Sequence, residues 1–237
     1  MRKILQLSLA FFNIMGINSI VNAVDEDAVG SAKYVAFLFD DGPHETNGIR
    51  ICDIAGSKGV SVSFAQVGKN IVKFPELTKR AAELGHQIVN HSMNHRKPPE
   101  IDLEALRKEI LDPVAVFIET LGKGPDLYWA PYLMLDDRMY SIIEEGGMEL
   151  LDVKKFKFAN TRDSDHKHIF RKDILERGTA EIIPRGTKAE ELRLVLCHEW
   201  RDDTVAVLAE MIDAYQEAGY AFVTVGELND LYRAKHP

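Results

Sequence analysis

The stretch YVAFLFDDGP, residues 34–43, decides the fold of this chain. A run of apolar, β-prone residues ends in two adjacent acids, Asp40 and Asp41, followed by Gly42 and Pro43. Neighbouring side chains of a strand point to opposite faces, so both acids can serve one site only if the chain turns there. Gly-Pro is a strong turn signal. Two acids at a turn are more often solvated or cap a helix, so the pair needs support from elsewhere in the sequence.

Beyond this stretch, apolar runs alternate with longer segments of helical periodicity. We predict strands at residues 34–39, 60–67, 87–90, 127–129, 150–153, 193–197 and 222–225. We predict helices at residues 48–58, 75–84, 102–121, 137–146 and 204–217. This alternation favours an α/β fold with a mainly parallel sheet covered by helices, either open or closed into a barrel. In such folds the functional residues gather at the carboxyl ends of the strands.

The amino-terminal segment differs from the rest. Arg2 and Lys3 precede an apolar stretch over residues 4–21, which is followed by small residues up to Ala23 and an acidic run. This is the layout of a secretory signal. An uncleaved membrane anchor fits less well, because polar residues interrupt a stretch that barely reaches the ~20 residues of a spanning helix. We predict a signal peptide at residues 1–23 and one domain over residues 24–237, secreted or periplasmic and free of the membrane after cleavage.

Composition and charge restrict the partners of this domain. The 237-residue chain is 46% hydrophobic and 28% charged, which is ordinary for a globular protein. Removing residues 1–23 takes away two basic residues and no acids, so the net charge changes from −8 to −10. This acidity disfavours nucleic acid and anionic membranes and suits a neutral or cationic partner. For Cys52 and Cys197 we favour two buried free thiols, although an oxidising compartment would permit a disulfide between them.

Two histidines follow the strand predicted at residues 87–90. His91 and His95, in the sequence HSMNH, share one face if this segment is helical, and they are then close enough to bind one metal ion. A lone histidine here would more often be structural. Ser92 occupies the position where the zinc-protease motif has glutamate, which disfavours a metalloprotease.

A third group of polar residues ends the strand predicted at residues 193–197, where LVLCHEW places His198. A histidine in this position can act as an acid or base near neutral pH, although a hydrogen-bonded surface histidine is commoner. Together the strand ends supply two histidines and a carboxylate that leave a coordination position open, as catalytic zinc sites require. A bound divalent metal would activate water and offset the charge of the paired acids. The same ligands could hold the iron of a non-haem oxygenase. The strand-helix alternation gives little support to that interpretation.

With these residues assembled, the chain resembles the NodB-homology polysaccharide deacetylases, carbohydrate esterase family 4. The resemblance covers about residues 34–230 and rests on FLFDDGPH, GVSVSFAQVGKNI, GHQIVNHSMNH, LVLCHEW and GYAFVTVGEL, in the order and spacing of the family. It implies a distorted (β/α) barrel of mainly parallel strands with outer helices. It also implies an acetylated polysaccharide or oligosaccharide substrate and a divalent metal, usually Zn2+, although Co2+ or another divalent ion could serve.

The resemblance implies a role for each matching residue. The metal ligands would be one carboxylate and two imidazoles, those of Asp41, His91 and His95. Asp40 would be the base that deprotonates the attacking water, and His198 the acid that protonates the leaving group. The backbone N–H of Tyr132 would help to hold the oxyanion, and Leu196 would line the pocket for the acetyl methyl group.

Two motifs depart from the family pattern. Trp129, in the sequence YWAPYL, stands where the family has an arginine that pairs with the catalytic base. Another cation, such as Arg162 or Arg171, would have to replace that arginine from a different loop. In the fourth motif Asp163 falls on the acid that tunes the catalytic histidine, and a shifted register would place Asp165 there instead.

These departures leave the implied ligands, base and acid in place, so we predict an active enzyme. The leading hypothesis is a metal-dependent hydrolase that removes acetyl groups from N-acetylglucosamine-containing glycans, such as chitin oligomers or peptidoglycan. One alternative is an O-acetyl esterase acting on acetylated xylan or a related polysaccharide, and another is a carbohydrate-binding protein that retains the metal with weak or no catalysis. Trp129 and Trp200 are candidates for stacking on sugar rings, although tryptophans near a pocket are as often packing residues.

Overall fold

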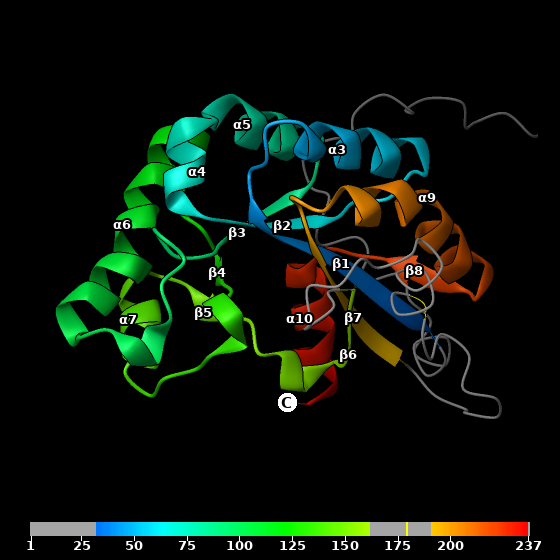
Figure 1. Cartoon of the computed structure of the whole chain (residues 1–237). Helices are drawn as coiled ribbons and strands as arrows, with labels where there is room; N and C mark the ends of the chain where they lie inside the picture. Colours follow the sequence, from blue (N-terminus) through cyan, green and yellow to red (C-terminus); the bar gives the residue numbers. More distant parts are fainter. Residues whose placement is uncertain (1–31, 162–178, 180–190, 237) are drawn as a thin grey trace, which may run out of the picture.

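The computed structural model describes residues 32–161, 179 and 191–236, and its centre is one parallel sheet (Figure 1). The strand order is β5-β4-β3-β2-β1-β7-β6, and β8 pairs with the first residues of β1. The strands are β1 (Lys33–Gly42), β2 (Ser63–Gln66), β3 (Gln87–Asn90), β4 (Leu127–Tyr128), β5 (Glu149–Leu150), β6 (Lys157–Asn160), β7 (Glu191–His198) and β8 (Tyr220–Phe222). All of these pairings are parallel, as predicted.

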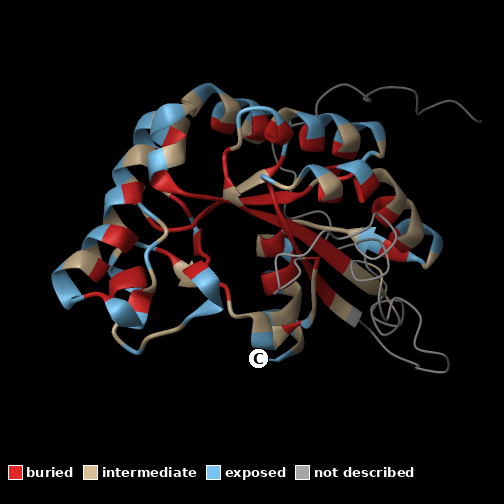
Figure 2. Cartoon of the chain, viewed as in Figure 1, coloured by how far each residue is buried: buried red, intermediate tan, exposed pale blue. Residues whose placement is uncertain are grey.

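Helices cover both faces of this curled half-barrel. They are α3 (Asn47–Ser57), α4 (Gly68–Lys73), α5 (Pro75–Glu83), α6 (Leu103–Leu121), α7 (Met139–Glu145), α9 (Asp202–Glu217) and α10 (Val225–Lys235). Short 3-10 turns lie at η1 (Pro98–Glu100), η2 (Pro131–Leu133) and η3 (Val153–Lys155). In Figure 1 the helices from α3 to α7, with α9, form an outer arc, whereas α10 lies within the curve of the sheet. Figure 2 shows buried strands and helices that are buried on the side facing the sheet.

The side chains of β1 build two separate cores. Val35, Phe37 and Phe39 face one side of the sheet, where they pack against α3 and α9. Ala36 and Leu38 face the other side, which α10 covers. All five residues are fully buried. Because both faces are covered, the strand needs an unbroken apolar sequence, which is why residues 34–39 contain no polar alternation.

The five predicted helices correspond to α3, α5, α6, α7 and α9, each within two residues at both ends. Local sequence explains the boundaries of α6: the Asp102 side chain accepts a hydrogen bond from the N–H of Ala105, and Gly122 ends the helix with a φ of 75°. The short helix α4 was not predicted, because six residues give too little periodicity to separate a helix from a loop.

Four of the strand predictions are wrong in part, and in the one at residues 127–129 the difference is a single residue, because β4 ends at Tyr128. Val60 and Val62 are buried but lie outside β2, because a loop can bury apolar side chains without pairing. Residues 151–153 follow β5 and lead into η3. Residues 223–225 are not a strand, since Thr224 caps α10 and forms a capping box with Glu227. The strand β6 was missed because its burial is only partial.

The predictions for the amino-terminal segment and for the two cysteines have different outcomes. The predicted signal peptide at residues 1–23 lies outside the described residues. None of the helices that the structure describes is long and apolar enough to cross a membrane. Cys52 and Cys197 are buried free thiols, as predicted.

Candidate active site

The turn that joins the two acids begins at Asp41 itself. Asp40 continues the alternation of β1 and faces the side of the sheet that holds Ala36 and Leu38. Asp41 would then face the opposite side, but its φ is 68° and the register of β1 against β2 shifts between Asp40 and Gly42. This local break in the strand allows both carboxylates to reach one site, which a regular strand forbids.

Contacts from distant segments hold this break in place. The N–H of Val67 donates to the carbonyl of Gly42 over 2.8 Å, and the Asn70 side chain donates to the carbonyl of Asp41 over 2.9 Å. On the other side, the buried carboxyl group of Glu199 accepts from the N–H of His44 over 2.8 Å. A Cβ atom on Gly42 would lie 1.7 Å from Glu199 Oε2, so any larger residue there would displace the Glu199 carboxyl group.

The segment His91–His95 is a loop, so the two histidines do not share the face of a helix. Ser92 and His95 have positive φ values of 66° and 60°. The N–H of His95 donates to Ser92 Oγ over 2.9 Å, and the N–H of Ser92 donates to Asn90 Oδ1 over 3.0 Å. This tight turn brings the two imidazole centroids within 4.8 Å, so the i, i+4 spacing serves the site by a different geometry.

A buried glutamate of α6 anchors the same loop. Glu109 accepts hydrogen bonds from the backbone N–H of Asn94 (2.8 Å) and from its side-chain amide (2.9 Å). Its own carbonyl accepts from the N–H of Met93 over 2.8 Å. Charge-assisted bonds of this kind are strong, and here they fix the residue that immediately precedes His95. Sequence reasoning missed Glu109, because its place in the apolar pattern of α6 marks it only as an unexplained polar residue.

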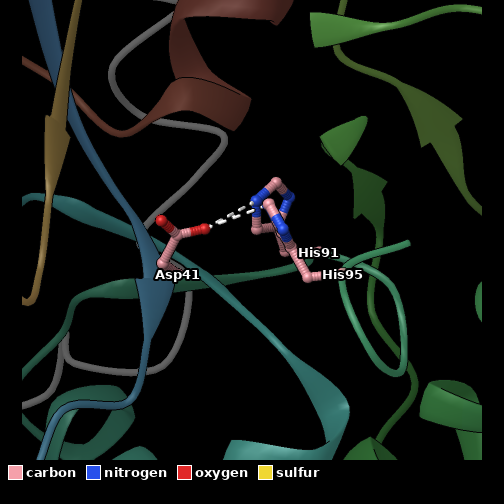
Figure 3. A group of neighbouring side chains, drawn as sticks. All are labelled: Asp41, His91 and His95. Carbon is pink, nitrogen blue, oxygen red and sulfur yellow. Dashed lines mark ion pairs between the residues drawn. The ribbon is translucent and has the colours of Figure 1, made fainter. Parts of the chain in front are cut away.

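One carboxylate oxygen of Asp41 faces both histidines (Figure 3). Asp41 Oδ1 lies 3.5 Å from His91 Nε2 and 3.1 Å from His95 Nε2. His91 Nδ1 lies 2.8 Å from the carbonyl oxygen of Trp129 and therefore carries the proton that it donates to it. His91 Nε2 is then an unprotonated acceptor, and it has no hydrogen-bond partner among the described residues. Complete burial lowers the pKa of His91, which keeps the ring neutral despite Asp41.

These three side chains fit a divalent cation. Burial favours a raised pKa for Asp41, but the two imidazoles beside its Oδ1, those of His91 and His95, hold the pKa of this carboxyl well below its usual range, so the carboxylate is ionised. A neutral imidazole nitrogen and a carboxylate oxygen facing each other are two acceptors, and a cation between them satisfies both. The structure thus contains a possible metal site at Asp41, His91 and His95.

A second group that overlaps this site contains Asp40, Asp41 and His198. Asp40 pairs with His198 in the register of β1 and β7, and His198 Nε2 lies 3.4 Å from Asp40 Oδ1. Asp40 Oδ2 lies 3.9 Å from His91 Nε2. Asp40 and His198 are therefore next to the first group, within reach of a proton carried by a molecule bound there.

A cavity of about 140 Å³ opens at this point, over the carboxyl ends of the strands. Its lining combines both acids with one histidine from a loop, one histidine from the end of β7, and apolar and amide side chains: Asp40, Asp41, His95, Tyr132, Leu133, Asn160, Leu196 and His198. Asn160 and Leu133 were not predicted as lining residues. The cavity is small enough that only a short group could enter it.

The predicted substrate-contacting residues take different positions. Leu196 is buried and lines the cavity, and Tyr132 is 47% exposed with its ring 4.5 Å from that of His95, centroid to centroid. Trp200 is 41% exposed and lies beside His198. The Trp129 side chain is only 1% exposed, so it offers no open ring face to a sugar, and this placement does not fit the expected stacking. Asp163, with Asp165, Arg162 and Arg171, lies outside the described residues.

Backbone conformations that L-residues rarely adopt are concentrated around this cavity. The non-glycine residues with positive φ in the described part of the chain are Asp41, Ser92, His95, Tyr132 and Leu133. Each costs about 1–3 kcal/mol and persists only where surrounding contacts impose it. Such strain clusters at functional sites, and four of these five residues line the cavity.

The family model for polysaccharide deacetylases matches residues 27–151, which include both acids and both histidines of the possible metal site. The chain belongs to the polysaccharide deacetylase family. A peptidoglycan-N-acetylglucosamine deacetylase of Bacillus cereus is 30% identical over 208 residues, covering 86% of this chain and 90% of that relative. A second relative, the peptidoglycan-N-acetylglucosamine deacetylase PgdA of Listeria monocytogenes, is 26% identical, and the match covers 83% of this deacetylase and 39% of PgdA.

Solved structures show the same fold for this deacetylase. The peptidoglycan deacetylase PdaC from Bacillus subtilis superposes with a TM-score of 0.73 at 22% identity, covering 86% of this chain and 94% of that one. A structure described as T48 deacetylase with substrate gives a TM-score of 0.69 at 24% identity, over 83% and 90% of the two chains. These likenesses confirm the distorted barrel of parallel strands with outer helices.

Proposed function

We propose that this deacetylase hydrolyses the acetamide of N-acetylglucosamine residues in peptidoglycan or a similar glycan. The observation that carries the proposal is the arrangement of Asp40 and His198 beside the group formed by Asp41, His91 and His95. The named activities of the relatives, which are peptidoglycan deacetylases, support the choice of substrate.

The three-residue group would hold the metal, and we propose Zn2+ because two imidazoles and one carboxylate suit it and leave a position open. When bound, such an ion supplies Lewis acidity toward water and toward a carbonyl oxygen. The unpartnered Nε2 of His91 supports this assignment, since a buried acceptor without a partner is costly.

The remaining residues would divide the proton transfers between them. Water adds to the carbonyl carbon of the acetyl group while Asp40 accepts a proton from that water. His198 then gives a proton to the amide nitrogen as the C–N bond breaks, which releases acetate and a free amine. The protonation is needed because an amine anion is a poor leaving group.

The substrate would be placed by the walls of the cavity. The acetyl methyl group would lie against Leu196, which is buried and apolar. The backbone N–H of Tyr132 would donate to the oxyanion that forms at the carbonyl carbon. The exposed ring of Tyr132 at the rim would contact the sugar. The acidic character of the chain, with a formal net charge of −8, suits a neutral or cationic glycan better than an anionic one.

Acetate release tests the substrate and the metal together. We expect release from N-acetylglucosamine oligomers and peptidoglycan, loss of release with a chelator, and recovery with added Zn2+ more than with Co2+. Release from acetylated xylan alone would replace the proposal with the O-acetyl esterase.

The variant Asp40→Asn separates catalysis from binding. It keeps the size of the side chain but cannot accept the proton, so we expect acetate release to fall by a factor of roughly 10²–10⁴, the usual contribution of a general base. Metal content should remain equal to that of the wild type. Equal and negligible release by the wild type and the variant on all of these glycans would favour the carbohydrate-binding protein.

A further inference from the structure

The two tryptophans of this chain, Trp129 and Trp200, both point their indole N–H groups at the acid pair. Trp200 Nε1 donates to Asp41 Oδ2 over 2.9 Å, and Trp129 Nε1 donates to Asp40 Oδ2 over 3.4 Å. The two tryptophans lie beyond the ends of two different strands: Trp129 follows β4 and Trp200 follows β7. Two adjacent carboxylates thus receive one indole donor each.

The hydrogen bond from Trp200 makes the two carboxylate oxygens of Asp41 different. Its indole holds Oδ2, while Oδ1 faces the Nε2 atoms of His91 and His95. Without a donor on Oδ2, the carboxylate could rotate about its last bond and present either oxygen to the histidines. A fixed orientation favours ligation through one oxygen, and partners that orient a ligand raise its affinity for a metal.

Trp129 contacts both halves of the site. Its indole N–H reaches Asp40 Oδ2, and its carbonyl oxygen accepts from His91 Nδ1 over 2.8 Å. Because its side chain is 1% exposed, water cannot replace the indole as a donor to Asp40. The indole leaves Asp40 Oδ1 facing His198 Nε2, which is 3.4 Å away.

We propose that Trp129 and Trp200 are positioning residues, which orient Asp40 for proton transfer and Asp41 for metal binding through their indole N–H groups. This inference rests on the proposed function, because it gives the two acids their separate roles. It assigns to Trp200 a hydrogen bond in place of sugar stacking, and to Trp129 a buried role that a stacking residue cannot have.

Replacing each indole by a phenyl ring, which is aromatic but has no N–H, tests the two parts separately. Trp200→Phe should weaken metal binding by about 10-fold, measured as the Kd for Zn2+ in competition with a chelating indicator. Trp129→Phe should lower kcat about 10-fold at saturating Zn2+ and glycan, with KM changed less than twofold and a smaller effect on the Kd for Zn2+. Tyr128→Phe, a neighbouring buried aromatic residue that packs in another cluster, is the control for loss of a buried polar atom.

A second replacement keeps the result interpretable if a phenylalanine variant folds poorly. Benzothienylalanine has the shape of tryptophan with sulfur in place of the indole N–H, and each single phenylalanine variant leaves one tryptophan position for it. The analogue should reproduce the loss of Zn2+ affinity at position 200 and the loss of kcat at position 129.

Two outcomes would overturn the inference: a Kd for Zn2+ equal to wild type when position 200 lacks the N–H, or a wild-type kcat when position 129 lacks it. A higher KM for Trp200→Ala combined with an unchanged Kd would return Trp200 to sugar stacking. If the wild-type protein itself binds no Zn2+, the proposed function fails instead, so the two failures are distinguishable.

Discussion

The two ends of the sheet differ in what their cavities contain. The cavity at the carboxyl ends measures about 140 Å³ and is lined by two acids, two histidines and residues with positive φ. The cavity at the amino ends of β3, β4 and β5 measures about 670 Å³. Its charged residues form ion pairs with one another, such as Arg233 with Glu149 and Arg233 with Asp230.

The candidate active site therefore lies at the smaller of these two cavities. At the carboxyl ends of the strands, carboxylate and imidazole side chains from different segments meet with their acceptor atoms facing one another. The backbone takes up strained conformations that bring them there. At the amino end, charges are neutralised by near neighbours and mostly lie on exposed side chains.

Replacing one of the three proposed metal ligands should cause the protein to lose its metal ion. His95→Ala removes one of three ligands, so we expect the Kd for Zn2+ to rise by more than the roughly 100-fold that is the upper range for residues that only orient a ligand. Metal content after dialysis measures this. His236→Ala, an exposed histidine after α10, is the control, and equal metal content in both variants would refute the ligand assignment.

Weakening the anchor of the histidine loop should have a smaller effect on the same quantity. Glu109→Gln replaces an acceptor oxygen by an amide that cannot accept from Asn94, so the loop loses a charge-assisted bond. We expect the Kd for Zn2+ to rise about 10-fold. Glu119→Gln, an exposed position on the same helix, should leave the Kd unchanged. Similar values for both variants would show that the loop holds its shape without Glu109.

The buried Glu199 should give the stability of the metal-free protein a pH dependence. Burial, opposed by the N–H of His44, raises the pKa of Glu199 from 4.5 to about 8. Because the folded state holds this proton more tightly than the unfolded chain, the stabilisation is full below about pH 4.5 and is lost as the pH rises to about 8.

The variant Glu199→Gln cannot ionise and should remove this loss. Across that range, the free energy of unfolding of the wild type should fall relative to the variant by up to ~1.4 kcal/mol per pH unit. Urea denaturation at several pH values with a chelator present measures it, and Glu217→Gln, exposed at the end of α9, serves as the control. Parallel profiles for wild type and Glu199→Gln would mean that Glu199 is not protonated in the fold.

The smallest effect is expected at the amino end. Asp126 and Lys123 line the larger cavity and form an exposed pair with atoms 3.8 Å apart, and exposed pairs contribute about 0–1 kcal/mol. The double variant Asp126→Asn, Lys123→Gln should change the rate of acetate release less than twofold. A larger loss of rate on polymeric glycan than on short oligomers would show that this cavity also binds substrate.

The sequence by itself determined the covered parallel sheet and the positions of the polar strand ends. Unbroken apolar runs such as residues 34–39 require burial on both faces, and periodicity fixed five helices to within two residues. Asp40, Asp41, His91 and His198 were also identifiable, since polar residues at the ends of buried strands are conspicuous in a linear sequence, and His95 was identifiable from its spacing after His91.

Only the tertiary structure decided how these residues face one another. Three features of the site depend on contacts between segments far apart in the sequence: the left-handed turn at Asp41, the non-helical loop of His91 and His95, and the two indole donors. Examples of such contacts are Glu199 against Gly42 and Trp129 against Asp40. Local propensity cannot predict such conformations, because they are unfavourable for the isolated segment and are stabilised only by the packing around them.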